Sequence, residues 1–395
     1  MRCEWKQVKL GDVATVKGGK RLPKNVNLIN TPNTHPYIRV RDLNDRITLE
    51  LNDSFLYVDD ETQKGISRYV VNSDDIVISI VGTIGLVAKI GKTLDGANLT
   101  ENCVKITNLQ NIDKEYLFYY LKSVFGQQEI MRGIVGAVQQ KLPIKNIQEI
   151  TIKCPELIEQ KKIAAILSAL DEKIAINRAI NDNLQQQAAS IFTKWLSTCA
   201  DASTIGDMSY NILDYSPVGS EQIRLLNSSD VTEGVFPIAP LVPNKDLKGH
   251  FKKRFKFGDI LYSEIRPRNH HYGFVLFDAS DYIASTRLMV IRAIENKVSP
   301  AMLYQYLLLP EVEAEFTLKT ESRSGTFPQG NYADMASIRV PYSPTDSQVA
   351  ISETLTQIRY NIAQNQLESQ RLAELRDTLL PKLMSGELDV SAIQL

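Results

Sequence analysis

Apolar residues in two segments of the chain recur with alternating spacings of three and four positions, a pattern that predicts two long helices with a coiled-coil seam. The first seam runs from Ile163 to Trp195, and the second lies between residues 351 and 383. Pro381 falls inside the second pattern, so we expect that helix to end or kink near Leu380. The seam positions expected to pair the helices are Ile163, Leu167, Leu170, Ile174, Asn177, Leu184 and Ile191 in the first segment and Ile351, Leu355, Ile358, Ile362, Asn365, Leu372 and Leu379 in the second.

Polar residues interrupt both seams at the same place. Asn177 and Asn181 stand in the first seam, and Asn365 and Ser369 stand in the second. A polar side chain buried in a seam fixes the register of the helices at some cost in stability. The matching interruptions therefore indicate that the two helices pair with each other. Antiparallel packing is the simpler geometry, because the intervening domain must bring the chain back.

The segments that precede the two predicted helices resemble each other. The run 75–79 recurs as 259–263, and the run 150–155 recurs as 336–341; each of the last two runs ends with a proline. These runs have the apolar, β-rich composition of strands. The sequence thus predicts an α+β protein with two similar mixed α/β domains, each followed by a long helix, and with the two helices paired as an antiparallel coiled coil.

The repeat divides the chain into four parts. A first domain is expected at residues 1–155 and its helix at 156–198. A second domain is expected at 199–343, and a second helix with a C-terminal tail at 344–395. The predicted strands are 36–40, 75–81, 85–90, 102–106, 258–263, 273–277 and 288–292, and the predicted helices within the domains are 114–123 and 300–308.

The bulk composition is that of an ordinary globular protein. A length of 395 residues suggests about two to three domains, and 43% hydrophobic with 23% charged residues lies outside the disordered range. We see neither an apolar run long enough to cross a membrane nor a secretory signal, so the cytoplasm is the expected location. The four cysteines lie far apart without a zinc-type spacing, which favours reduced thiols.

The sequence does not favour catalysis by this chain. Residues 85–93 end in Gly-Lys-Thr, but their glycine spacing does not fit a phosphate-binding loop and the run reads as a strand. A dinucleotide fingerprint, a nucleophile elbow and the Asn-Pro-Pro-aromatic segment of adenine methyltransferases are all absent from the sequence. Asp74, Asp75 and Asp259 could suggest a metal-dependent nuclease, although a turn-forming role is more economical for an aspartate that follows a glycine. We therefore predict neither catalytic nor metal-binding residues.

Three motifs, in their order and duplication, carry a family resemblance. They are residues 5–13, the Gly-Thr-Ile-Gly turn at 82–85, and the segment 136–142, which contains two glutamines. With these motifs the chain resembles the specificity subunit of type I restriction-modification systems along essentially its whole length. The second copy departs from the pattern at 264–267 and 324–329, so residue roles there transfer less directly.

The resemblance implies two target recognition domains that each read one half of a split site in double-stranded DNA, with the paired helices setting the gap. It also implies two modification subunits, which bring S-adenosylmethionine and methylate adenine, and restriction subunits, which use ATP and Mg. No cofactor is then expected on this chain. A protein-interaction scaffold with duplicated binding domains is an alternative, and a third is that the chain itself is an enzyme.

The first copy offers polar candidates on predicted loops. Side chains read base edges, Arg or Lys on guanine and Asn or Gln on adenine, whereas phosphate contacts position the protein. In the run 17–21 the glycines could let the backbone approach a phosphate, although a solvated turn explains this loop equally well. The candidates in this copy are Lys17, Gly18, Gly19, Lys20, Arg21, Arg39, Arg41, Thr83, Gln139, Gln140 and Lys141.

The second copy contains the densest basic cluster, at 248–256, followed by a loop at 266–272 that combines base-edge donors with a stacking ring. Because the net charge of the chain is only −1, local clusters of this kind must carry any DNA contact. A solvated charged face remains the alternative for the lysines. The candidates are Lys252, Lys253, Arg254, Arg266, Arg268, Asn269, His270, His271, Tyr272, Arg323, Ser324, Thr326 and Gln329.

Overall fold

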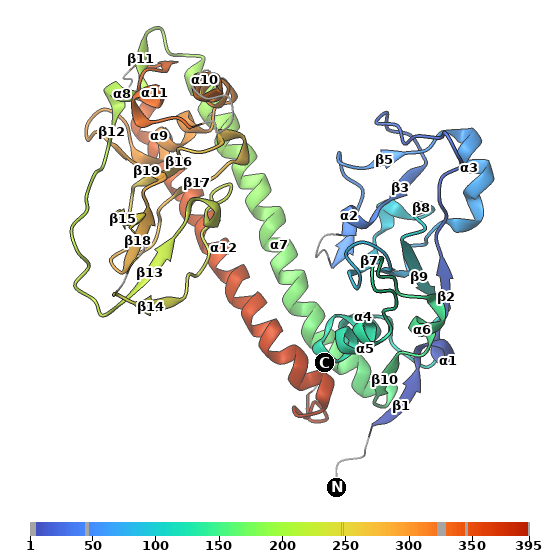
Figure 1. Cartoon of the computed structure of the whole chain (residues 1–395). Helices are drawn as coiled ribbons and strands as arrows, with labels where there is room; N and C mark the ends of the chain where they lie inside the picture. Colours follow the sequence, from blue (N-terminus) through green and yellow to red (C-terminus); the bar gives the residue numbers. More distant parts are fainter. Residues whose placement is uncertain are drawn as a thin grey trace. The chain divides into compact units, whose positions relative to one another are not determined.

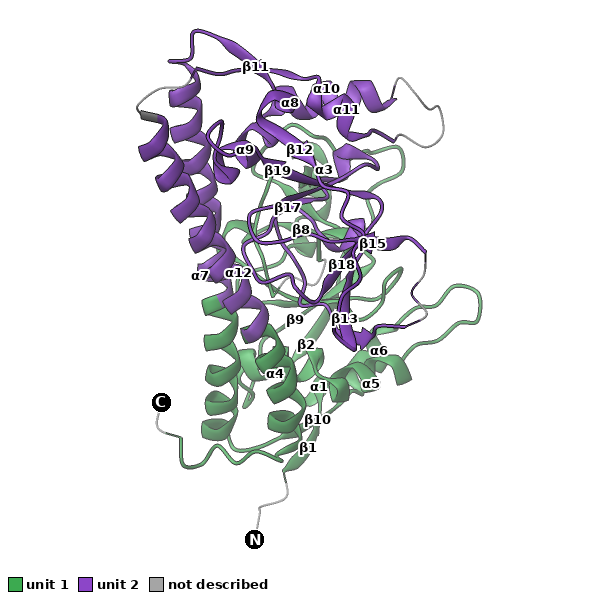
Figure 2. Cartoon of the chain, turned by 90° about the vertical axis from the view of Figure 1, so that its left-hand side faces the viewer, with its two compact units in different colours: residues 1–173, 372–395 green, residues 174–371 purple. Residues whose placement is uncertain are grey.

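The computed structural model describes residues 5–43, 47–245, 247, 249–321, 329–343 and 347–393. The chain forms two compact units, one of residues 1–173 and 372–395 and the other of residues 174–371 (Figure 2). Each unit contains a mixed α/β domain together with part of each long helix, α7 (Leu157–Leu196) and α12 (Ser347–Ser385). The predicted fold class of two similar mixed α/β domains, each followed by a long helix, is confirmed.

The first unit is built on a five-stranded sheet in the order β2-β9-β6-β7-β4. Figure 1 labels β2, β9 and β7 of this sheet. A three-stranded sheet has the order β5-β3-β8, and β1 pairs with β10. The strands are β1 (Lys6–Lys9), β2 (Thr15–Gly18), β3 (Pro36–Ile38), β4 (Thr48–Leu49), β5 (Leu56–Tyr57), β6 (Ile76–Ser79), β7 (Val87–Ile90), β8 (Asn98–Leu99), β9 (Cys103–Thr107) and β10 (Thr151–Cys154). The helices before α7 are α1 (Leu10–Val13), α2 (Val40–Leu43), α3 (Asp60–Ile66), α4 (Lys114–Lys122), α5 (Val124–Arg132) and α6 (Ile144–Gln148).

The second unit repeats this plan. Its four-stranded sheet has the order β12-β19-β16-β17, a second sheet has the order β14-β13-β18-β15, and β11 pairs with β20. The strands are β11 (Ala202–Thr204), β12 (Ser209–Asn211), β13 (Gln222–Leu226), β14 (Leu241–Pro243), β15 (Phe251–Lys253), β16 (Ile260–Ser263), β17 (Tyr272–Phe274), β18 (Tyr282–Ser285), β19 (Leu288–Ala293) and β20 (Arg339–Pro341). The helices between the long ones are α8 (Ile205–Met208), α9 (Pro300–Leu307), α10 (Pro310–Glu321) and α11 (Tyr332–Ala336).

The middle strand of each central sheet, β6 or β16, begins with the same turn and ion pair. Asp75 accepts a hydrogen bond from the backbone N–H three residues earlier and pairs with Lys105 at 3.0 Å. Asp259 does the same with its own preceding turn and pairs with Arg292 at 2.6 Å. Both aspartates are almost fully buried. Each aspartate shapes a turn and pairs with a cation. These two structural roles explain why the aspartate occurs in both copies, and a nuclease site is not needed to explain it.

Each domain packs one helix, α4 in the first unit and α9 in the second, on its central sheet. In the first unit α4 is buried along residues 116–121 against Ile76, Ile78 and Val104, and Asp113 caps its first turn. In the second unit α9 is buried along 301–307, and Ser299 caps it.

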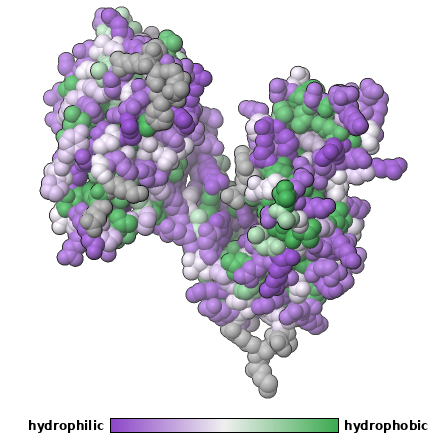
Figure 3. All heavy atoms as spheres, viewed as in Figure 1, coloured by the Kyte–Doolittle hydropathy of each residue, from purple (hydrophilic) through white to green (hydrophobic). Residues whose placement is uncertain are grey.

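On the face drawn in Figure 3, hydrophilic residues cover most of the surface, with smaller hydrophobic patches between them.

The two long helices lie side by side in both units (Figures 1 and 2). In the first unit Ile163 and Leu167 of α7 share a core with Leu383 of α12, and Asp171 pairs with Arg376 at 2.7 Å. In the second unit the shared core contains Phe192 and Trp195 of α7 with Leu355, Ile358 and Ile362 of α12. All the predicted seam residues are buried or half-buried.

Contacts between the helices run antiparallel in each unit, because rising residue numbers on α7 meet falling ones on α12. In the first unit Lys162 donates to the carbonyl of Ser391, which lies beyond the C-terminal end of α12, whereas Asp171 lies further along α7 and meets Arg376 within α12. In the second unit Asn177 meets Ser369 and Asn181 meets Asn365. The knobs-into-holes geometry of a coiled coil itself stays a prediction.

The sequence predicts that Pro381 ends or kinks the second helix near Leu380; the predicted end is wrong, and a kink stays a prediction. Helix α12 continues through Pro381 to Ser385, and Gly386 follows with a φ of +75°. The proline removes one backbone donor, but only in the last turns of the helix. Leu383 and Met384 are 2% and 0% exposed in the core of the first unit, so their burial favours continuing the helix past the proline.

The polar interruptions of the seam form one hydrogen-bonded cluster. The Asn177 amide nitrogen lies 2.8 Å from Glu368 and 3.2 Å from the Ser369 hydroxyl, and the Asn365 amide donates to the Asn181 side-chain oxygen at 2.9 Å. Asn177 is 1% exposed, and its side-chain oxygen has no hydrogen-bond partner. A buried amide with one unsatisfied atom costs stability, which fits a residue kept for register.

Replacing Asn177 and Asn365 together by Leu should raise the free energy of unfolding by about 1 kcal/mol. The variant removes the unsatisfied Asn177 oxygen and extends the apolar seam, which offsets the loss of the hydrogen bond from Asn365 to Asn181. The same change should permit slipped or oligomeric forms, detected by light scattering and cysteine cross-linking across the helices. The matched control is Arg178→Leu with Gln364→Leu, on exposed positions of the same helices. A double variant that stays uniformly paired in one register would show that these asparagines do not set it.

Candidate nucleic-acid interface

Two loops of the first unit that are far apart in sequence meet at the end of the central sheet. Val81, just after β6, forms a backbone bridge with Lys141, and Leu142 donates to the Ile80 carbonyl at 2.9 Å. This pairing places the Gly-Thr-Ile-Gly turn beside the segment that contains the two glutamines. The side chains brought together here are all exposed: Thr83, Gln139, Gln140 and Lys141.

The turn after β6 depends on glycine and on the last residue of the strand. Gly82 and Gly85 have φ values of +81° and +90°, the left-handed region that other residues rarely adopt. The Ser79 hydroxyl donates to the Thr83 carbonyl at 2.6 Å and accepts from the Leu86 N–H at 2.9 Å. The turn is therefore held from within the domain, which leaves the Thr83 side chain exposed.

The second unit has the same loop pair although its sequence differs. Ile265, just after β16, bridges to Gln329, and the Gly330 N–H donates to the Glu264 carbonyl at 2.8 Å. Gln329 is half-buried. Arg323, Ser324 and Thr326, the other predicted residues of this loop, lie outside the described residues.

The basic run 17–21 differs from the expected flexible loop. Lys17 and Gly18 belong to β2, and only Lys20 and Arg21 lie beyond it with exposed side chains. A Cβ on Gly19 would lie 2.0 Å from the Thr100 carbonyl oxygen. Gly19 is thus needed because two segments of backbone lie close together within the domain. Its presence no longer indicates a place where the backbone approaches a phosphate.

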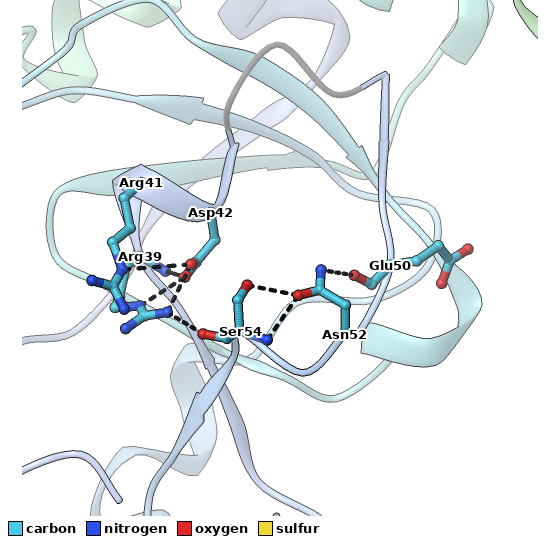
Figure 4. Close-up of polar contacts among 6 residues, drawn as sticks. All are labelled: Arg39, Arg41, Asp42, Glu50, Asn52 and Ser54. Carbon is cyan, nitrogen blue, oxygen red and sulfur yellow. Dashed lines mark hydrogen bonds and ion pairs between the residues drawn. The ribbon is translucent and has the colours of Figure 1, made fainter. Parts of the chain in front are cut away.

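Arg39 and Arg41 differ in their surroundings although they are neighbours (Figure 4). The Arg39 side chain is 14% exposed, and its guanidinium donates two hydrogen bonds of 2.8 Å to Asp42 and one of 2.9 Å to the Ser54 carbonyl. Arg39 therefore ties the short helix α2 to the following loop. Arg41 is 68% exposed and lies 3.9 Å from the same carboxylate, so it is the more available of the two.

The sequence suggests that Lys253 belongs to a basic surface, but the structure places its side chain inside the domain. It is 4% exposed, donates to the Leu288 carbonyl at 2.7 Å and lies 3.5 Å from Glu264, and burial lowers its pKa. Lys252, its neighbour on β15, is exposed, because successive side chains of a strand point to opposite faces. Arg254 is half-buried and donates to the Ser280 carbonyl at 2.8 Å. Only Lys252 among these three presents its cation openly.

The loop between β16 and β17 is held in a strained conformation. Arg266 and His270 have φ values of +47° and +53° and flank a 3₁₀ turn, Pro267–Asn269. Non-glycine residues in this region cost energy and are often found at functional sites. The side chains of Arg266, Arg268 and Asn269 are exposed.

The aromatic members of this loop have partners inside the domain. Tyr272 stacks on Tyr262 with ring centroids 5.6 Å apart and packs against Tyr304, so it is not a free platform for a base. His271 lies 2.9 Å from the Val231 carbonyl through Nδ1. The expectation that this loop offers a stacking ring is therefore wrong, because the tyrosine belongs to the aromatic core of the sheet.

His270 lies between two carboxylates. Its Nδ1 is 3.2 Å from Glu233 and its Nε2 is 2.8 Å from Glu313 on α10. These two carboxylates raise the pKa of His270 above its ordinary value, with the hydrogen bond to Glu233 as the largest cause. The carboxylates come from sequence positions 37 and 43 residues away, so no local pattern could have revealed them.

A histidine ring titration should place the pKa of His270 above the ordinary 6.5. Because the folded-state pKa is raised, protonated His270 stabilises the loop at low pH, and this contribution is lost as pH rises through the raised value. Histidine NMR on the full chain measures the midpoint, which should fall in Glu313→Gln and stay unchanged in Glu315→Gln, a control on the same helix. A midpoint at or below 6.5 in the unmodified protein would contradict the assignment.

Neither a metal centre nor a membrane span is found in the described ranges. No cluster of three or more His, Cys, Asp or Glu with the geometry to hold a metal ion occurs among them. No helix in these ranges combines the length and apolar character needed to cross a bilayer.

The geometry defines a duplicated binding protein: each unit presents, at the end of its central sheet, a turn after the middle strand joined to the loop that precedes a long helix. The chain matches the family described as type I restriction modification DNA specificity domain over residues 3–186 and 239–376. These segments make up most of its length, and the chain belongs to this family.

Two relatives and one solved structure illustrate the family. The HindI specificity subunit of Haemophilus influenzae is 35% identical over 179 residues, 45% of this chain and 39% of that protein. The putative MjaX specificity subunit of Methanocaldococcus jannaschii is 25% identical over 98% of this chain and 94% of that protein. The S subunit of a type I restriction-modification system from M. genitalium has a similar fold, with a TM-score of 0.59 and 18% identity over 97% of this chain and 96% of that one.

Proposed function

We propose that this chain is the sequence-specific DNA-binding subunit of a type I restriction-modification complex, and that each unit reads one half of a bipartite site. The observation that carries the proposal is the recurrence of one loop pair in both units, joined by the Val81–Lys141 bridge in the first and the Ile265–Gln329 bridge in the second. Because the same loop pair carries different residues in the two units, each unit can bind a different DNA half-site.

Exposure and side-chain type together divide the candidate residues into those that suit base edges, those that suit phosphates and those that support the loops. Gln139 and Gln140, and in the second unit Asn269, carry side chains that suit adenine edges, and Arg266 suits guanine edges. Residues that suit phosphate contacts are Lys20, Arg21, Arg41, Lys141, Lys252 and Arg268. Thr83 and Gln329 stand at the junction of the two loops. Lys253, Arg39 and Tyr272 act inside the domains and support the loops.

The chain acts without catalysis of its own and addresses the chemistry of its partners. In this proposal two modification subunits bind S-adenosylmethionine and methylate adenine, and restriction subunits use ATP and Mg to move and cut DNA. The complex works in the cytoplasm, where the DNA is. Helix α7 has 40 residues and is about 60 Å long at 1.5 Å per residue, and we assign to the helix pair the role of setting the number of base pairs between the half-sites.

Exchanging residues 1–155 for those of a relative with another target should change one half of the methylated site and leave the other half and the spacer intact. Methylome sequencing of cells carrying the hybrid chain measures this. The matched control exchanges residues 199–343 and should change the opposite half. Hybrids in which both halves change together would refute the assignment of one half-site to each unit.

A protein-interaction scaffold is the competing function, and salt separates the two. DNA affinity of the assembled complex should fall steeply with ionic strength and depend on sequence, because phosphate contacts release counterions and base-edge contacts discriminate. A complex whose DNA binding is indifferent to both would favour the scaffold.

A further inference from the structure

Each unit holds an exposed candidate arginine in an ion pair with a glutamate. In the first unit Arg21 lies 2.7 Å from Glu101, with the arginine side chain 80% and the glutamate 30% exposed. In the second unit Arg268 lies 3.1 Å from Glu321, with side-chain exposures of 72% and 45%. In both pairs the arginine is open to solvent, and its carboxylate partner is the more buried member.

The fold, and not the local sequence, supplies these carboxylates. Glu101 is 80 residues from Arg21, and Glu321 at the end of α10 is 53 residues from Arg268. Glu101 is also fixed by the neighbouring Thr100 hydroxyl, which donates to its second oxygen at 3.2 Å. A third cation of the same kind is His270, on the loop of Arg268, which faces Glu233 and Glu313. One exposed candidate arginine in each unit is thus already paired with a carboxylate before DNA arrives.

An exposed ion pair of this type contributes little to stability, so a phosphate can replace the carboxylate at small cost. While the pair persists, however, the carboxylate balances the charge of the arginine, so that this arginine attracts DNA less. Non-specific DNA binding rests almost wholly on phosphate contacts, whereas a specific complex adds base-edge contacts that can drive the exchange. The net charge of −1 for the whole chain agrees with cations that are already balanced internally.

We propose that Glu101 and Glu321 are specificity-determining residues, which hold Arg21 and Arg268 in neutral pairs until a docked DNA phosphate takes the place of the carboxylate. Their effect is to lower affinity for non-target DNA more than for target DNA. This inference rests on the proposed function, since it needs the two loops to face DNA.

The test measures binding of the full chain, assembled with its modification subunits, to random-sequence duplex and to the duplex that carries the methylated site. Glu101→Gln should raise affinity for random duplex about three- to tenfold at about 0.1 M salt and steepen the salt dependence by about one phosphate contact. Affinity for the target duplex should rise less, so the ratio of the two affinities falls. Glu321→Gln should behave alike.

A double-mutant cycle separates pairing from general charge. In an Arg21→Ala background, Glu101→Gln should no longer raise affinity, because no arginine is released; Arg268→Ala should likewise abolish the effect of Glu321→Gln. Glu149→Gln is the matched control, since it breaks the exposed Lys9–Glu149 pair of the first unit, with the same change in charge but away from the candidate loops. Thermal melting of each variant checks that the fold is kept.

Two outcomes would overturn the inference: a gain in Glu101→Gln no larger than that in Glu149→Gln, or a gain that persists without Arg21. Either result leaves the proposed function intact if the unmodified complex still prefers its target. If the unmodified complex does not bind the target duplex more tightly than random duplex, that result contradicts the proposed function itself. Failure of the inference and failure of the proposed function are therefore distinguishable.

Discussion

Completion of each hydrophobic core by both long helices is the constraint on which the rest of the structure depends. The domain of the first unit closes over Ile163 and Leu167 of α7 and also over Leu383 and Met384, which come from the far end of the chain. The second unit closes over Phe192 and Trp195 of α7 together with Leu355 of α12. Neither α/β domain is therefore complete without a helix from the opposite half of the polypeptide.

This constraint places the functional loops. In both units the loop before the last short helix of the domain, α6 or α11, is joined by a backbone bridge to the turn after β6 or β16. The two loops therefore meet at one end of the central sheet. The turn is formed by different residues in the two units: glycines with positive φ in the first, and Arg266 and His270 with positive φ in the second. A fixed framework with variable loops is what a protein needs to read two different DNA sequences with one fold.

Much of the framework could be predicted because it depends on periodic burial. The seams and the strands around β6, β7, β9, β16 and β19 follow from apolar spacing, and the structure places elements there. The repeated aspartates follow from the internal repeat of the sequence. The shortest strands carry too few residues to show a period. Pro381 misled because helix propensity is a local preference, and the burial of Leu383 and Met384 overrides it.

The candidate interface was harder to predict than the fold. Residue type indicates which side chains could touch DNA but not which way they point, and Lys253 and Tyr272 turn into the domain while Lys252 stays outside. The carboxylates that pair with Arg21, Arg268 and His270 lie dozens of residues away and become neighbours only through the tertiary structure. Such partners carry no sequence signal of their own.

Hydrogen exchange on a chain shortened after Arg371 tests most directly whether the far helix completes the first domain. Loss of residues 372–395 removes Leu383 and Met384 from the core that covers α4. We expect amides of Lys114–Lys122 to lose protection while those of Leu288–Ala293 in the other unit keep it. Unchanged protection of Lys114–Lys122 in the shortened chain would contradict the account.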